Sequence, residues 1–181
     1  SNAIAIASAL RAYLRYRATR GDAVQPLLAV FSPPANWRLA SLPRGLKPEE
    51  VDRLLGSFTE ALPSRRRGYA VVRLALDLGL RCIEICRLQL ADIDWRQGAI
   101  ALKRTKSRRQ DILPLPIATG RALEAYLRHE RPRTSDSAVF VRHLAPHDKP
   151  IGVDAIRRII RDAYRRIGIP HGRAHAMRHT V

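Results

Sequence analysis

The fold of this 181-residue chain is decided by residues 78–102, LGLRCIEICRLQLADIDWRQGAIAL, where helical periodicity gives way to strand periodicity. Gly79 follows a long apolar helical pattern, and glycine readily takes up the left-handed conformation that closes many helices. A further helix is predicted over 81–90. The turn residues 94–98 then lead into the apolar run 99–102, which predicts a strand.

A hairpin follows from the next segment. Residues 111–115 form a second predicted strand, and 105–109 between the strands are polar and basic. Two short strands joined by a polar connection favour antiparallel pairing. We therefore expect a small antiparallel sheet with a basic tip.

Helical patterns surround this hairpin. Pro48 and the two acids after it suit a helix start, and apolar spacing continues to Leu62. Ser64 can cap the next helix, which is apolar nearly all round and should be central. Two more helices are predicted over 117–130 and 152–167. The predicted fold class is α+β, mostly α-helical, with one small antiparallel sheet.

The N-terminal part of the sequence lacks the sustained pattern of helices and strands that follows it. Residues 1–3 resemble the remnant of an expression tag, and 4–18 form a basic amphipathic helix. Residues 21–46 have no sustained period and hold several prolines and glycines, so they are interpreted as a linker or a meandering connection. We therefore predict the end of one domain plus linker over 4–41, and a second domain over 42–181.

The charge points to a polyanionic partner. Lys and Arg together number 33 against 16 acids, which gives a net charge of +17. The basic residues are mostly arginine, whose planar fork meets phosphate oxygens in pairs. They lie on several separate segments, which favours double-stranded DNA over a membrane surface. The alternative is an arginine-rich sequence with solvated helix faces. No signal peptide or membrane-spanning run is visible, so we expect a cytoplasmic protein on the nucleoid.

Metal binding is not predicted. Cys82 and Cys86 have helical i, i+4 spacing that could support a metal, but small buried apolar residues are the favoured interpretation. His175 and His179 share that spacing. A zinc protease would need Glu after the first His, and Ala176 stands there. No cofactor is expected.

Three patches carry candidate chemistry, and each is weak alone. They are LGLRCIEICRLQLADIDW (78–95), LKRTKSRRQDILPLP (102–116) and HAMRHT (175–180). Together and in this order they resemble the catalytic domain of the tyrosine recombinases, the phage-integrase family. The resemblance runs from about Leu42 to Val181, and the helix at 4–18 looks like the last helix of the family's core-binding domain, which clamps DNA from the opposite side.

The resemblance implies site-specific DNA recombination or integration. A Tyr nucleophile breaks a phosphodiester and forms a 3′-phosphotyrosyl link, which a 5′-hydroxyl then reverses without ATP. Arg81 and Arg178 would hold the non-bridging oxygens and stabilise their charge. His175 would donate to the phosphate or move a proton, and Lys106 would protonate the leaving 5′-oxygen.

Other residues take supporting positions in this reading. Glu84 and His179 would orient their catalytic neighbours. Lys103 competes with Lys106 for the lysine role, although the spacing back from Pro114 favours Lys106. The predicted phosphate contacts, each with the alternative of a solvated surface, are Arg11, Arg15, Lys103, Arg104, Arg108 and Arg109.

No tyrosine stands where the family has its nucleophile. All precede the box at 175–180: Tyr13, Tyr16, Tyr69, Tyr126 and Tyr164. We therefore expect this chain to be truncated before the nucleophile, to bind DNA without cleaving it, and to be monomeric, although its parent would be a tetramer on synapsed DNA. One alternative is a non-catalytic recombinase remnant that only occupies sites. Another is an unrelated basic architectural protein whose patches match by chance.

Overall fold

A computed structural model gives the fold. It describes residues 2–30, 45–103, 110–146 and 149–169, together with Gly172 and Met177. The chain separates into two compact units, residues 1–42 and 43–181, and each is described by itself.

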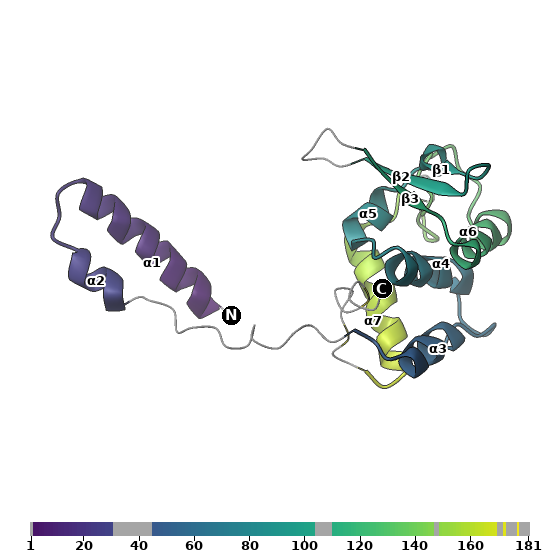
Figure 1. Cartoon of the computed structure of the whole chain (residues 1–181), viewed down its shortest axis with the longest axis horizontal. Coiled ribbons are helices and arrows are strands. Elements are labelled where there is room, and N and C mark those ends of the chain that lie inside the picture. Colours follow the sequence, from purple (N-terminus) through teal and green to yellow (C-terminus); the bar gives the residue numbers. More distant parts are fainter. Residues whose placement is uncertain are drawn as a thin grey trace. The chain divides into compact units, whose positions relative to one another are not determined.

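The first unit holds two helices that contact each other, α1 (Asn2–Thr19) and α2 (Gln25–Val30) (Figure 1). The predicted basic helix corresponds to α1. The prediction of an irregular connection from residue 21 was wrong for the stretch that forms α2. Pro26 is the second residue of α2, where a missing backbone N–H breaks no helical hydrogen bond, so this proline starts a helix instead of preventing one.

The second unit begins with α3 (Pro48–Gly56), which starts at the predicted proline but ends sooner than Leu62. The hydroxyl of Ser57 donates to the carbonyl of Leu54 over 2.7 Å and occupies an acceptor at the helix end. A serine that bonds locally to the backbone in this way competes with further helix growth.

The central helix is α4 (Arg65–Asp77), and its N-terminus is capped from a distance. Ser64 precedes the helix in a left-handed conformation, and its hydroxyl hydrogen-bonds to Nδ1 of His143 at 2.7 Å, so the predicted serine cap is wrong. The carboxylate of Glu130 instead accepts from the backbone N–H groups of Arg66 and Arg67, at 2.7 and 3.0 Å. A carboxylate suits the positive end of a helix dipole.

After Gly79, whose φ of +59° is left-handed as predicted, the chain forms α5 (Cys82–Arg87) and a 3-10 turn, η2 (Leu90–Asp92). The predicted helix over 81–90 is thus split in two. The strands β1 (Ile93–Asp94), β2 (Ala99–Lys103) and β3 (Gln110–Pro114) then build an antiparallel sheet in the order β1-β2-β3. The two predicted strands are confirmed, and β1 is an addition.

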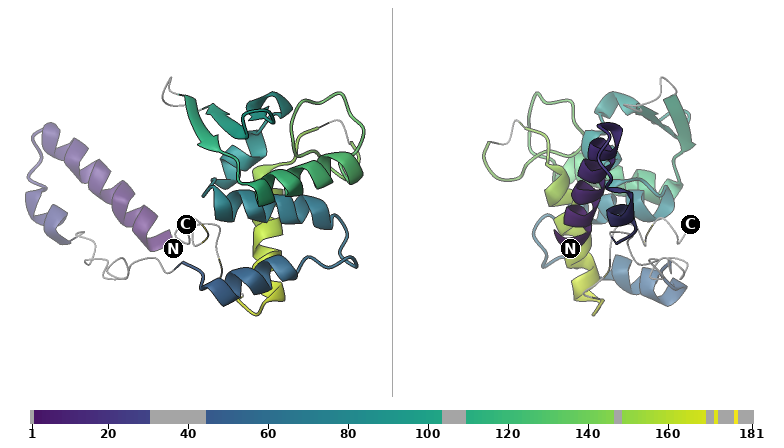
Figure 2. Two further views of the ribbon diagram at one scale, coloured as in Figure 1. Left: turned by 45° about the vertical axis from the view of Figure 1, so that its right-hand side comes forward. Right: turned by 90° about the vertical axis from the view of Figure 1, so that its left-hand side faces the viewer.

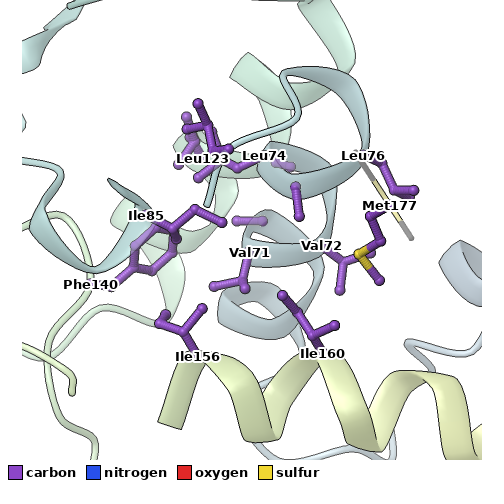
Figure 3. Close-up of a cluster of buried hydrophobic side chains, with 14 of the residues drawn as sticks. Val71, Val72, Leu74, Leu76, Ile85, Leu123, Phe140, Ile156, Ile160 and Met177 are labelled. Atoms are coloured by element: carbon purple, nitrogen blue, oxygen red, sulfur yellow. The ribbon is translucent and has the colours of Figure 1, made fainter. Parts of the chain in front are cut away.

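Helices α6 (Ile117–His129) and α7 (Val153–Arg166) complete the unit, and α3, α5, α6 and α7 all contact α4 (Figure 2). The core therefore centres on α4 (Figure 3). Its fully buried large side chains include Leu74, Ile85, Leu123, Phe140, Ile156, Ile160 and Met177. The predicted fold class, mostly helical with a small antiparallel sheet, is confirmed.

Candidate functional site

Arg81 stands at the start of α5 and is held by one carboxylate. Glu84 accepts from the backbone N–H of Arg81 at 2.7 Å and from its Nη1 at 2.8 Å. The Arg81 side chain remains 55% exposed, against 21% for Glu84. The guanidinium is therefore oriented by a neighbour while it stays accessible to an anion from solvent.

Buried residues on both sides fix the backbone of Arg81. Leu80 is 2% exposed and Ile85 is fully buried, and both belong to the core around α4. Gly79 supplies the left-handed turn that brings the chain from α4 into this position. The location of Arg81 thus follows from core packing.

The β2–β3 ladder carries the basic tip. Its last pair joins Lys103 to Gln110, and at the opposite end Ala99 pairs with Pro114. Lys103 therefore belongs to the strand, whereas Lys106 falls between the two strands in sequence. The predicted tip residues Arg104, Lys106, Arg108 and Arg109 lie outside the described residues.

The box at 175–180 is described only at Met177, because His175, Arg178 and His179 lie outside the described residues. Met177 is fully buried and belongs to the same core cluster as Val72 and Leu76 of α4 (Figure 3). Sequence analysis did not assign Met177 a part. Its signal was available, since it is a lone apolar side chain of core size within a polar run.

Gly172, which precedes the box in the sequence, is held closely as well. The N–H of Gly172 donates to the carbonyl of Ile169 over 3.1 Å. A Cβ placed on Gly172 would overlap Cγ and Cδ1 of Tyr164, so the backbone here passes against the face of that ring. Only glycine allows this approach without a shift.

On α1, Arg15 is exposed, and Arg11 is half-buried with its Nε donating to the carbonyl of Ala7 at 3.4 Å. Two tyrosine–arginine pairs that sequence analysis missed lie at the C-terminal end of this helix, the second reaching one residue beyond it. Nη1 of Arg17 donates to the Tyr13 hydroxyl at 3.0 Å, and a similar pair forms four residues apart at Tyr16 and Arg20. Their i, i+4 spacing was the available signal.

Two of the tyrosines, Tyr126 and Tyr164, are core residues. Tyr126 is fully buried and stacks on Phe140 with ring centroids 5.2 Å apart, and Tyr164 is 1% exposed. Burial raises the pKa of Tyr164 to about 12 and also raises that of Tyr126. Both hydroxyls therefore stay protonated at neutral pH and away from solvent.

The two cysteines are partly buried and pack against the core. Burial is the main cause that raises the pKa of each thiol, which disfavours the thiolate a metal requires. Cys86 also donates its S–H to the carbonyl of Ile151 at 2.9 Å. Within the described ranges no cluster of three or more His, Cys, Asp or Glu forms a metal site, and no helix there is long and apolar enough to cross a bilayer.

Comparison with known proteins gives consistent matches. The Phage integrase family matches residues 44–181. The putative integrase/recombinase y4rA of Sinorhizobium fredii is 38% identical over 97% of this chain and 43% of its own length. A second protein of that organism, y4gC, is 32% identical over 77% of this chain and 73% of its own length. The chain spans less than half the length of the first curated relatives, y4rA and y4rF.

Solved structures agree with the sequence matches. The crystal structure of XerA recombinase is 26% identical, with a TM-score of 0.65 over 83% of this chain and 50% of that one. The crystal structure of the lambda integrase (residues 75–356) bound to DNA shares the fold at 15% identity, with a TM-score of 0.69 over 98% of this chain and 62% of that one.

Proposed function

We propose that this chain, which belongs to the phage integrase family, takes part in site-specific DNA recombination. The second unit would supply the phosphate-binding residues of the reaction, and double-stranded DNA would be the partner. A protein of this kind would work on the nucleoid in the cytoplasm.

The proposed chemistry uses fixed cations in place of a metal. Arg81 and Arg178 would bind the non-bridging oxygens of one phosphate and stabilise the charge that develops on them. His175 would donate to the phosphate, and Lys106 would protonate the leaving 5′-oxygen. His179 would orient the neighbouring catalytic side chains. The nucleophile would be a tyrosine that forms a 3′-phosphotyrosyl link.

The observation that carries the proposal is the pairing of Arg81 with Glu84, which orients an exposed guanidinium. A preorganised donor is worth more to a transition state than a freely moving one, because it needs no reordering during the reaction. Support for the second arginine comes from Met177, which precedes Arg178 in the chain and is buried in the core that also holds Leu80 and Ile85.

Each unit by itself carries proposed DNA contacts, the second unit at the hairpin tip and the first unit on α1. Lys103, Arg104, Arg108 and Arg109 would contact phosphates from the hairpin, and Arg11 and Arg15 from the first unit. Contacts of this type add affinity with little sequence information, and they weaken as salt displaces them.

A salt titration tests this surface. We would measure fluorescence anisotropy of a labelled duplex at rising salt with the wild-type chain and with an Arg108→Ala/Arg109→Ala variant. Each lost phosphate contact should reduce the slope of log K against log salt by about one, so the variant's slope should fall by about two. Arg128→Ala is the control, because Arg128 already pairs with Glu124 at 3.1 Å on α6. An unchanged slope in the hairpin variant would reject the hairpin as a DNA contact.

The alternative function is a non-catalytic DNA-binding remnant of a recombinase that only occupies sites. We propose that residues 1–181 alone bind DNA as a monomer and form no covalent link, whereas the parent recombinase acts as a tetramer. Light scattering tests the mass, and a denaturing gel with a nicked duplex tests the link. A covalent adduct would contradict the proposal.

Sequencing the source gene past the codon for Val181 separates the two functions. A reading frame that continues through a His or Trp and then a Tyr supports an active recombinase. A stop codon at that point supports the remnant that only occupies sites.

A further inference from the structure

A cavity of about 410 Å³ lies between α4 and α6, and its lining residues are none of those assigned to the recombination chemistry. Three arginines line it: Arg65, Arg66 and Arg121. Arg65 pairs with Glu60 at 2.6 Å, and Glu60 is itself 88% exposed. Within the part of the chain that the structure describes, the side chains of Arg66 and Arg121 form no ion pair. The cavity therefore offers two guanidinium groups, those of Arg66 and Arg121, that no ion pair among the described residues engages.

Its floor is aromatic and held in place. The rings of Phe58 and Tyr69 meet edge to face, with centroids 5.9 Å apart at 80°. Arg166 lies over the Phe58 ring at 4.5 Å from its centroid. A Cβ on Gly68 would come within 2.7 Å of the same ring, so Phe58 rests directly against the backbone of α4. An apolar group that entered the cavity would meet a preformed surface.

One wall is made of small side chains. Ala118, Ala122 and Ala125 line the cavity from one face of α6 at i, i+4 and i+7. Their size keeps the cavity open, and a larger residue at Ala118, which is exposed, would fill it.

We propose that this cavity docks an acidic segment of a partner protein, with one bulky apolar side chain on the aromatic floor and carboxylates on the guanidinium groups of Arg66 and Arg121. A free phosphate would use the guanidinium groups and leave the floor uncovered. A DNA backbone would do the same, because it carries no apolar side chain. A second copy of this chain is disfavoured by its net charge of +17.

The test uses a short fluorescein-labelled peptide of Asp and Glu residues around one central Trp, and a matched peptide with Ala in place of Trp. Anisotropy is measured with the whole 181-residue chain without DNA, so the result does not depend on the proposed recombination. The variants are Arg121→Glu, which reverses a cavity charge, and Ala118→Trp, which fills the cavity at unchanged charge. Arg161→Glu on the exposed face of α7 makes the same charge change elsewhere.

The proposal expects the Trp peptide to bind at least about tenfold more tightly than the Ala peptide. Arg121→Glu and Ala118→Trp should each lower the affinity for the Trp peptide by about tenfold. Arg161→Glu should change that affinity by less than about twofold. Equal binding of the two peptides would overturn the proposal, as would equal effects of Arg121→Glu and Arg161→Glu. It would also fail if Arg121→Glu lowered duplex affinity as much as peptide affinity, since the cavity would then belong to the DNA surface. Because Arg121 is exposed, its substitution keeps the test valid if Ala118→Trp does not fold.

Discussion

The carboxylate of Glu84 holds Arg81 at two points, its backbone N–H at 2.7 Å and its Nη1 at 2.8 Å. The first bond satisfies a donor at the start of α5, and the second directs a guanidinium that is more than half exposed. One side chain thus joins the local fold of α5 to the orientation of the candidate phosphate-binding arginine.

Replacing Glu84 should cost more stability than replacing an ordinary surface acid. Glu84→Ala removes a bond to a helix-start N–H together with an ion pair, so we expect a loss of about 1–1.5 kcal/mol in the free energy of unfolding. The matched control is Glu124→Ala, which breaks only the exposed pair with Arg128 and should cost about 0.5 kcal/mol or less. Urea denaturation measures both. Equal losses would mean that the backbone bond of Glu84 contributes nothing.

Gly172 should tolerate no side chain. A Cβ there would overlap the Tyr164 ring, so Gly172→Ala should destabilise the chain by about 1–3 kcal/mol through overpacking. Gly56→Ala is the control, because nothing lies within 4 Å of its Cβ position at the end of α3. That variant should be neutral or slightly stabilising. If thermal denaturation gave the two variants the same melting temperature, Gly172 would not rest on Tyr164 as described.

Met177 should behave as a core residue although polar residues surround it in sequence. It is fully buried, so Met177→Ala should lower the free energy of unfolding by about 2–5 kcal/mol. Met177→Leu keeps the volume and should cost less than about 1.5 kcal/mol. Chemical denaturation of both variants measures the difference. A cost below about 0.5 kcal/mol for the alanine variant would show that Met177 is not packed in the core.

Alkaline pH should destabilise the fold through Tyr164. Its pKa is raised from 10.0 in the unfolded reference to about 12 in the fold, because burial disfavours the phenolate. Because the pKa is higher in the folded state, the contribution of Tyr164 to stability is complete below pH 10 and is lost as the pH rises toward 12. Between pH 9 and 11.5 the free energy of unfolding of the wild-type chain should therefore fall by about 2 kcal/mol more than that of the Tyr164→Phe variant. Parallel stability curves for the two chains would contradict this assignment.

Local patterns predicted the elements that local physics determines. Pro48 begins α3, Gly79 follows α4 in a left-handed turn, and the apolar run over 99–102 lies in β2. The short helix α2 was missed because Pro26 was taken as a sign of irregular structure, although proline is well suited to the first turn of a helix.

Contacts between distant residues account for the remaining differences. The cap of α4 comes from Glu130, more than sixty positions further along the chain, and Ser64 bonds to His143 instead. Spacing around Ser64 could not reveal either bond, because both partners arrive only when the chain is folded. In the candidate site, too, some residues were predictable from local sequence and others depend on distant contacts. Arg81 and Glu84 were identifiable from their motif, but the part of Met177 depends on the core that receives it.

The proposed recombination chemistry requires Arg81 and Arg178 to bind one phosphate. The most direct measurement is a crystal structure of this chain bound to a DNA duplex. We expect both guanidinium groups to lie within about 3 Å of the non-bridging oxygens of a single phosphate, and this expectation is what the structure would test. It would be contradicted if the two arginines contacted different phosphates, or if Arg178 made no contact with the DNA.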